Sequence, residues 1–136
     1  MARKATAIVL DSWAILAYFE DEPAAERVAD IIADAHEEDV PLFMTVVNLG
    51  EVWYIIAREA SGADANRSIT ELRQLGIKFV DADWDLAYEA AGLKSKHKMS
   101  FADCFAAALA KQKKAHLITG DPEFKQVEQA LTIVWL

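Results

Sequence analysis

The stretch Ala7-Ile8-Val9-Leu10-Asp11-Ser12 decides the fold, because four apolar residues run directly into a carboxylate. A continuous apolar run rich in β-branched residues is typical of a strand that is buried on both faces of a parallel sheet. Asp11 then lies where the strand ends, and Ser12 is placed to cap a following helix. Ligands of open α/β sheets bind beyond the carboxyl ends of the strands. Asp11 is therefore either part of a metal site or a turn residue.

Similar apolar runs recur along the chain and alternate with helical patterns. Helices are expected at 13–19, from 23 (after a cap at 22) to about 38, and at 46–60, 63–75, 83–93 and 100–113, with a short helix after 122. Strands are expected at 7–10, 42–45, 77–80, 116–119 and 132–135. Strands that alternate with helices predict an α/β fold with a parallel sheet and helices on both of its faces.

The composition limits the class of protein. The chain has 136 residues, of which 54% are hydrophobic and 26% charged, as expected for one globular domain over residues 1–136. Its single cysteine excludes an internal disulfide and a thiolate zinc cluster. Asp11 and Glu20 interrupt the apolar start, and no run approaches the ~18 apolar residues of a membrane span. We therefore expect a cytoplasmic protein without a membrane partner.

The net charge of −8 argues against a simple nucleic-acid binder, which usually carries a basic footprint. Any contact with a nucleic acid must come from a local basic patch. The best candidate is Lys94, Lys96 and Lys98, in an expected loop just before the helix at 100–113. These lysines are either RNA-backbone contacts or a solvated loop.

Four acidic residues stand out. Three have ordinary structural explanations: Asp11 as a turn residue, Asp121 as the cap of a helix that starts at Pro122, and Asp103 in a capping box. Glu51 is harder to explain, because its helix is apolar nearly all round and is expected to be buried. A buried carboxylate without a base must protonate, find a distant partner or bind a cation.

Considered together, the four acids predict a metal site. Asp11 and Asp121 follow strands at the same edge of the sheet, and Asp103 starts a helix that faces this edge. Two carboxylates ~5 Å apart at an effective dielectric of ~20 repel each other by roughly 3 kcal/mol. A fold that gathers four of them needs a hard divalent cation, and oxygen-only ligands favour Mg²⁺ or Mn²⁺.

Four motifs in this order resemble those of PIN-domain ribonucleases, and specifically of VapC-like toxins of bacterial toxin–antitoxin pairs. The motifs are Val9–Ser12, Asn48–Glu51, Ser100–Cys104 and Leu117–Phe124. The resemblance covers essentially the whole chain. It implies a single PIN domain with a five-stranded parallel sheet, a homodimer, and a VapB-like antitoxin that covers the active-site groove.

The resemblance also implies a catalytic Mg²⁺ site formed by Asp11, Glu51, Asp103 and Asp121, with Mn²⁺ as a substitute. One or two ions would activate water for attack on an RNA phosphodiester and leave a 5′-phosphate. Asn48 and Thr119 are candidates to orient the carboxylates, although both also suit ordinary helix caps or polar contacts.

Other functions fit less well. A phospho-acceptor receiver domain needs a lysine after its last strand, which here ends in Val134-Trp135-Leu136. A dehalogenase-like phosphatase needs Asp-x-Asp after its first strand, where this chain has Asp11-Ser12-Trp13. The remaining alternative is a non-catalytic PIN module that binds RNA or protein.

Overall fold

A five-stranded sheet forms the centre of the computed structural model, which describes residues 4–21 and 23–136. All neighbouring strands pair in parallel, in the order β3-β2-β1-β4-β5. The strands are β1 (Ile8–Leu10), β2 (Leu42–Thr45), β3 (Ile77–Val80), β4 (His116–Thr119) and β5 (Thr132–Trp135). The predicted α/β class and the five parallel strands are therefore confirmed.

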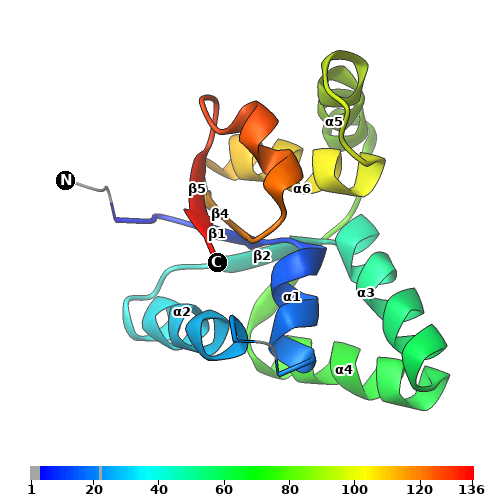
Figure 1. Ribbon diagram of the computed structural model, residues 1–136. Helices are drawn as coiled ribbons and strands as arrows, with labels where there is room; N and C mark the ends of the chain where they lie inside the picture. The colour runs from blue at the N-terminus through cyan, green and yellow to red at the C-terminus, as the bar shows by residue number, and fades with distance from the viewer. Residues whose placement is uncertain (1–3, 22) are drawn as a thin grey trace.

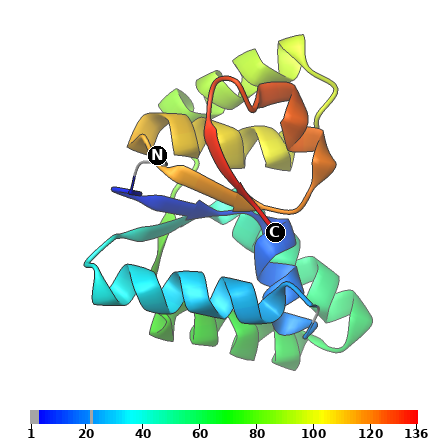
Figure 2. The same ribbon diagram turned by 60° about the vertical axis from the view of Figure 1, so that its left-hand side comes forward.

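Helices cover both faces of the sheet (Figures 1 and 2). They are α1 (Ser12–Phe19), α2 (Ala25–Glu37), α3 (Val46–Glu59), α4 (Gly62–Gln74), α5 (Trp84–Lys96), α6 (Phe101–Lys113) and the 3₁₀-helix η1 (Pro122–Val127). One face carries α1, α2, α4 and most of α3, and the other carries α5, α6 and η1. None of the helices in the described part of the chain is long and apolar enough to cross a membrane.

Alternate residues of the central strands enter two separate cores. Val9 of β1 and Leu117 of β4 pack with α6, whereas Leu10 and Ile118 pack with α1 and α2. This division explains why the apolar run in β1 is continuous: every one of its residues is buried. In α6, residues 103–110 are all buried, so the position of its N-terminus is fixed by the core.

The structure corrects three local expectations. Helix α5 continues to Lys96, so Lys94 and Lys96 lie in its last turn rather than in a loop, where their charge is favourable. Asp11, and not Ser12, is the N-cap of α1. Helix α3 is less buried than its apolar composition predicts, because only Asn48 and Val52 of its residues are fully buried.

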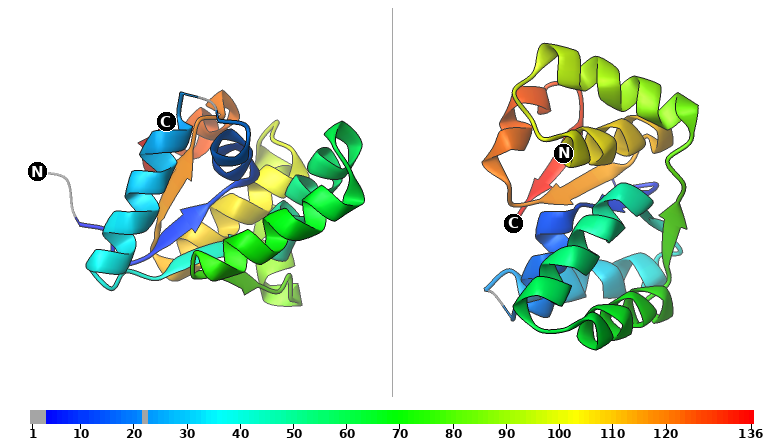
Figure 3. Two further views of the ribbon diagram at one scale, coloured as in Figure 1. Left: turned by 90° about the horizontal axis from the view of Figure 1, so that it is seen from below. Right: turned by 90° about the vertical axis from the view of Figure 1, so that its right-hand side faces the viewer.

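The carboxyl ends of the strands meet along one edge, and several following elements begin there. Helix α1 starts directly after β1, α3 directly after β2 and η1 shortly after β4. Figure 3 shows the same chain from two further sides, with the sheet between its two helical layers. The parallel topology therefore brings residues from distant parts of the sequence to one edge.

Candidate functional site

Asp11 is buried at the junction of β1 and α1, with 1% of its surface exposed. Its Oδ1 accepts a hydrogen bond from the backbone N–H of Ala14 at 2.8 Å, which caps the helix. Its Oδ2 accepts a hydrogen bond from the Thr119 hydroxyl. The Thr119 oxygen also accepts a bond from the backbone N–H of Asp121 at 3.0 Å. Thr119 thus holds the Asp11 carboxyl group and the turn after β4 in one arrangement.

Burial raises the pKa of Asp11 to about 7. The hydrogen bonds from Thr119 and Ala14 favour the ionised form and oppose this rise. The negative charges of Asp121 and Glu51 add to it. Asp11 therefore lies within electrostatic reach of two other acids, and its carboxyl group holds a proton more tightly than an exposed aspartate does.

Asp103 lies in the first turn of α6, where the Ser100 hydroxyl caps the helix by accepting a bond from the Asp103 backbone N–H at 3.1 Å. Burial raises the pKa of the Asp103 carboxyl to about 8. A hydrogen bond with the Glu123 side chain and the charges of Asp121 and Asp11 contribute to this rise in the pKa, and the hydrogen bond with Ser100 opposes it. A carboxyl group in these surroundings retains its proton unless a cation takes the place of that proton.

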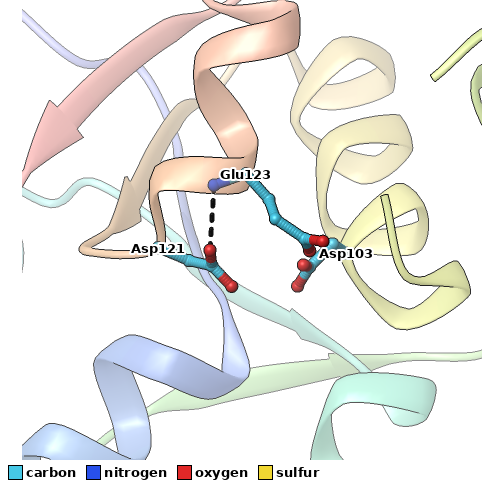
Figure 4. Close-up of side chains that lie close together, drawn as sticks. All are labelled: Asp103, Asp121 and Glu123. Atoms are coloured by element: carbon cyan, nitrogen blue, oxygen red, sulfur yellow. Dashed lines mark hydrogen bonds between the residues drawn. The ribbon is translucent and has the colours of Figure 1, made fainter. Parts of the chain in front are cut away.

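Three carboxylates converge at the start of α6 and η1. One oxygen from each of Asp103, Asp121 and Glu123 lies within 4.8 Å of the others (Figure 4). Asp121 also caps η1, because its Oδ1 accepts a bond from the Glu123 backbone N–H at 2.9 Å. The Glu123 side chain points from η1 across to Asp103 on α6. This group joins two elements that are far apart in the sequence.

Glu123 was not among the acids expected at the site. It lies within the motif Leu117–Phe124, two residues after Asp121. The sequence feature that could have indicated it is its position just after Asp121, the expected cap of the helix. An acidic residue in the first turn after a capping Asp lies at the same end of the helix as that Asp. Its direction toward α6, however, depends on how η1 packs, which the sequence pattern does not specify.

Glu51 occupies the second turn of α3 and is half-buried rather than buried. Its charge acts on Asp11, so it borders the site, but it is not one of the three converging carboxylates. The expectation that Glu51 is buried is therefore wrong, and its burial no longer requires a proton, a base or a cation. Its nearness to Asp11 is the remaining reason to place it at the site.

The Asn48 side chain supports the site through hydrogen bonds to one backbone carbonyl and two hydroxyl groups, and no hydrogen bond to a carboxylate is found for it within residues 4–21 and 23–136. Its Nδ2 donates to the carbonyl of Ala102 at 3.0 Å and to the hydroxyl of Ser12 at 3.3 Å. Its Oδ1 accepts from the Thr45 hydroxyl. Ala102 and Ser12 adjoin Asp103 and Asp11, so Asn48 fixes the chain beside two acids. The sequence had suggested that Asn48 would orient the carboxylates themselves.

The lysines expected to contact RNA differ in their surroundings. Lys94 Nζ donates to the carbonyl of Met99 at 2.6 Å, which ties the end of α5 to the segment before α6. The backbone of Lys98 forms two hydrogen bonds with the side chain of Gln126 on η1. Lys96 is exposed. These positions leave RNA contact by the three lysines as a prediction.

The acidic side chains of the site could hold a hard divalent cation. All of these side chains offer carboxylate oxygens as ligands. The ion pairs found in the described part of the chain, Arg67–Asp64 and Lys111–Glu89, do not involve these acids. Carboxylates this close together repel one another, and a cation bound among them would remove the repulsion. Mg²⁺ and Mn²⁺ prefer such ligands.

Comparisons with known proteins agree with this fold. A family model described as the PIN domain matches residues 8–130. No curated protein matches the chain. Among solved structures, a VapC toxin of Mycobacterium tuberculosis, described as cleaving the sarcin–ricin loop, has 16% identity and a TM-score of 0.72, over 89% of this chain and 95% of that one.

Two toxin–antitoxin complexes are also similar in structure. VapBC2 of Rickettsia felis, bound to promoter DNA, has 13% identity and a TM-score of 0.72, over 96% of this chain and 98% of that one. A DNA-bound VapBC of Salmonella typhimurium has 12% identity and a TM-score of 0.73, over 94% and 96%. At these identities the likeness shows the fold alone.

Proposed function

The chain belongs to the PIN domain family, and from this membership and its acidic site we propose that it is a Mg²⁺-dependent endoribonuclease. The observation that carries the proposal is the convergence of Asp103, Asp121 and Glu123. Asp11 lies within electrostatic reach of Asp103 and Asp121, and Glu51 lies within electrostatic reach of Asp11. A site that concentrates carboxylates without a base is suited to a metal and to little else. Mn²⁺ is a reasonable substitute.

The four acids Asp11, Glu51, Asp103 and Asp121 remain our proposed catalytic metal ligands, and Glu123 joins them. A bound divalent ion would lower the pKa of a water molecule and offset the charge that develops on the scissile phosphate. Asp11 and Asp103 must release their protons to act as ligands, because the raised pKa values keep them partly neutral. Thr119 keeps the Asp11 carboxyl in one orientation throughout.

We further propose that the protein is the toxin of a type II toxin–antitoxin pair. The support is the similarity of nearly the whole chain to toxins solved with their antitoxins. A VapB-like antitoxin would then cover the acidic site, and the chain would form a homodimer in the cytoplasm. The RNA substrate would meet Lys94, Lys96 and Lys98 close to the start of α6.

The test is cleavage of total RNA by the purified, antitoxin-free protein in Mg²⁺ or in EDTA, beside Asp11→Asn. A matched control is Asp30→Asn, which makes the same change at an exposed position of α2. We expect cuts with 5′-phosphate ends that require Mg²⁺, are lost in Asp11→Asn and are retained in Asp30→Asn. Mapping of these ends would identify the target.

The alternative function is a non-catalytic PIN module that binds RNA or protein. The absence of cleavage by the folded protein on every cellular RNA, with RNA binding retained, would favour this alternative. Cleavage that survives both EDTA and Asp11→Asn would come from a contaminant, and the assay would then be repeated on protein purified under denaturing conditions and refolded.

A further inference from the structure

The indole of Trp13 borders the acidic site and is only partly covered. Trp13 is the second residue of α1, two positions after Asp11 and directly before Ala14, whose N–H binds Asp11. It keeps 37% of its surface exposed, whereas its neighbours Ser12, Ala14 and Ile15 are buried. A partly exposed aromatic ring beside a proposed nuclease site is a candidate platform for a nucleobase.

The six-membered ring of Trp13 lies directly on Gly120. A Cβ atom at position 120 would come within 2.3 Å of Cη2, 2.4 Å of Cζ3 and 2.6 Å of Cζ2, so only glycine allows this contact. Gly120 links Thr119, which binds Asp11, to Asp121 of the converging carboxylates. Figure 4 shows the start of α1, in blue, beside the turn that carries Asp121. The indole is thus held in a fixed place between two parts of the site.

The charge of the protein makes such a ring useful. The chain carries a net charge of −8, and five acids surround the site, so that phosphates are repelled when no cation is bound. Stacking of a nucleobase on an aromatic ring involves no net charge and tolerates any base, and it contributes about 1–3 kcal/mol per base. An RNA-cutting site of this charge gains affinity from a contact of this kind.

We propose that Trp13 is a substrate-binding residue, on whose indole a nucleobase of single-stranded RNA stacks next to the scissile phosphate. The contact with Gly120 fixes the ring relative to Asp11 and Asp121, so stacking places the adjoining phosphate at the carboxylates. This inference rests on the proposed ribonuclease function and adds to it a residue that positions the substrate.

The experiment measures binding of two fluorescein-labelled probes: a 12-nucleotide RNA of random sequence, and a ribose–phosphate chain of equal length without bases. All proteins carry Asp103→Asn, which is expected to prevent cleavage, and Mg²⁺ is present. Trp13→Phe keeps an aromatic ring, and Trp13→Leu keeps apolar cover for Gly120 without one. Trp84→Leu is the matched control, because Trp84 is 72% exposed on α5 and its aromatic partner is Tyr88.

We expect Trp13→Leu to weaken RNA binding about 5- to 150-fold, the range that one lost stacking contact gives. Binding of the base-free chain should not change, Trp13→Phe should retain most of the affinity, and Trp84→Leu all of it. Equal affinities of Trp13→Leu and Trp13→Phe would overturn the proposal, since the side chain would then only cover Gly120. Equal losses for both probes, or no preference of the parent protein for RNA with bases, would overturn it as well.

Failure of this inference can be told apart from failure of the proposed function. Thermal unfolding of each variant with its Asp103 restored reports folding and the stabilisation by Mg²⁺, and RNA cleavage by the unchanged protein reports the nuclease. Cleavage without a Trp13 effect rejects only the stacking contact. A Trp13 effect on binding without any cleavage rejects only the nuclease and leaves an RNA-binding PIN module.

Discussion

Asp11 and Asp103 make the stability of the metal-free protein depend on pH. Their pKa values rise from 3.8 to about 7 and about 8 on folding, chiefly through burial. The folded state therefore holds protons more tightly than the unfolded chain, and stability due to these groups is greatest at low pH. It falls as the pH rises from about 4 to about 8 and is level above that. We expect urea unfolding in EDTA to show lower stability at pH 8 than at pH 5.5.

The Asp103→Asn variant isolates the contribution of one group to this slope. With an uncharged amide at position 103, the difference in stability between pH 5.5 and pH 8 should shrink, whereas Asp30→Asn should retain the full difference. An unchanged slope in Asp103→Asn would show that the carboxyl group is ionised throughout this range. Mg²⁺ binding should follow the opposite trend and strengthen with pH, because the ligands must lose their protons.

Glu123 adds a third carboxylate beside those of Asp103 and Asp121, whose negative charges repel each other when both are ionised. Above pH 8, where Asp103 is ionised, Glu123→Gln removes one charge from the group with Asp103 and Asp121, so we expect the metal-free protein to melt at a higher temperature there, by a few degrees. The increase in melting temperature on adding Mg²⁺ should become smaller at the same time. Glu128→Gln makes the same substitution at an exposed position just after η1 and should change neither value. A full response to Mg²⁺ in Glu123→Gln would exclude Glu123 as a ligand.

At the scale of elements, the contact between α1 and the turn after β4 requires glycine at position 120. In Gly120→Ala, the added methyl would overlap the Trp13 ring, and we expect a loss of about 1–3 kcal/mol in the free energy of unfolding. Gly92→Ala is the opposite case, because Gly92 lies in α5 with no atom within 4 Å of an added Cβ. It should gain about 0.5–1 kcal/mol. Urea unfolding of both variants checks the pair, and a neutral Gly120→Ala would mean that Trp13 moves freely.

The strands and most helices could be predicted from the sequence because the determining interactions are local. The apolar run at Ile8–Leu10 and the matching runs of the other strands are each flanked by residues that end a strand. The ends of the helices depend on finer competition. Lys94 and Lys96 continue α5 because lysine is a good helix former and Lys94 Nζ finds the Met99 carbonyl, a contact that no pattern reveals.

The burial of α3 could not be predicted from its composition. Its residues are apolar on most sides, yet Trp53 and Tyr54 are 38% and 43% exposed. Trp53 Nε1 donates to Asn66 on α4, so α3 packs with α4 on one side and leaves another side open. The number of elements that pack against α3 is smaller than its apolar composition suggests. That number depends on how the whole fold is assembled, so it cannot be read from the sequence of the helix.

At the scale of the whole molecule, the parallel topology accounts for the part of the site that could be predicted. Asp11 and Asp121 follow β1 and β4, which are neighbours in the sheet, so their closeness follows from the strand order. Asp103 and Glu123 meet for another reason. The Gln126 side chain exchanges hydrogen bonds with the Lys98 backbone and holds η1 against the segment before α6. The sequence contains no local signal for this contact, which is why Glu123 was missed.

The balance of charge in the whole molecule leads to the last prediction, a specific stabilisation by Mg²⁺. The chain has a net charge of −8, so any salt would reduce general repulsion, but only an ion held by the site binds the folded state selectively. At a free Mg²⁺ concentration 100 times its Kd, this binding adds about 2.7 kcal/mol to the free energy of unfolding. The melting temperature in MgCl₂ should therefore be higher than the melting temperature in NaCl of equal ionic strength.

A variant of one ligand separates the site from the general effect of charge. In Glu51→Gln the excess of MgCl₂ over NaCl should shrink, while the response to NaCl itself stays the same. The control Glu59→Gln changes an exposed acid at the far end of the same helix and should keep the full excess. If MgCl₂ and NaCl stabilise the unchanged protein equally, the carboxylates act only through their summed charge, and neither a metal site nor a metal-dependent nuclease can be maintained.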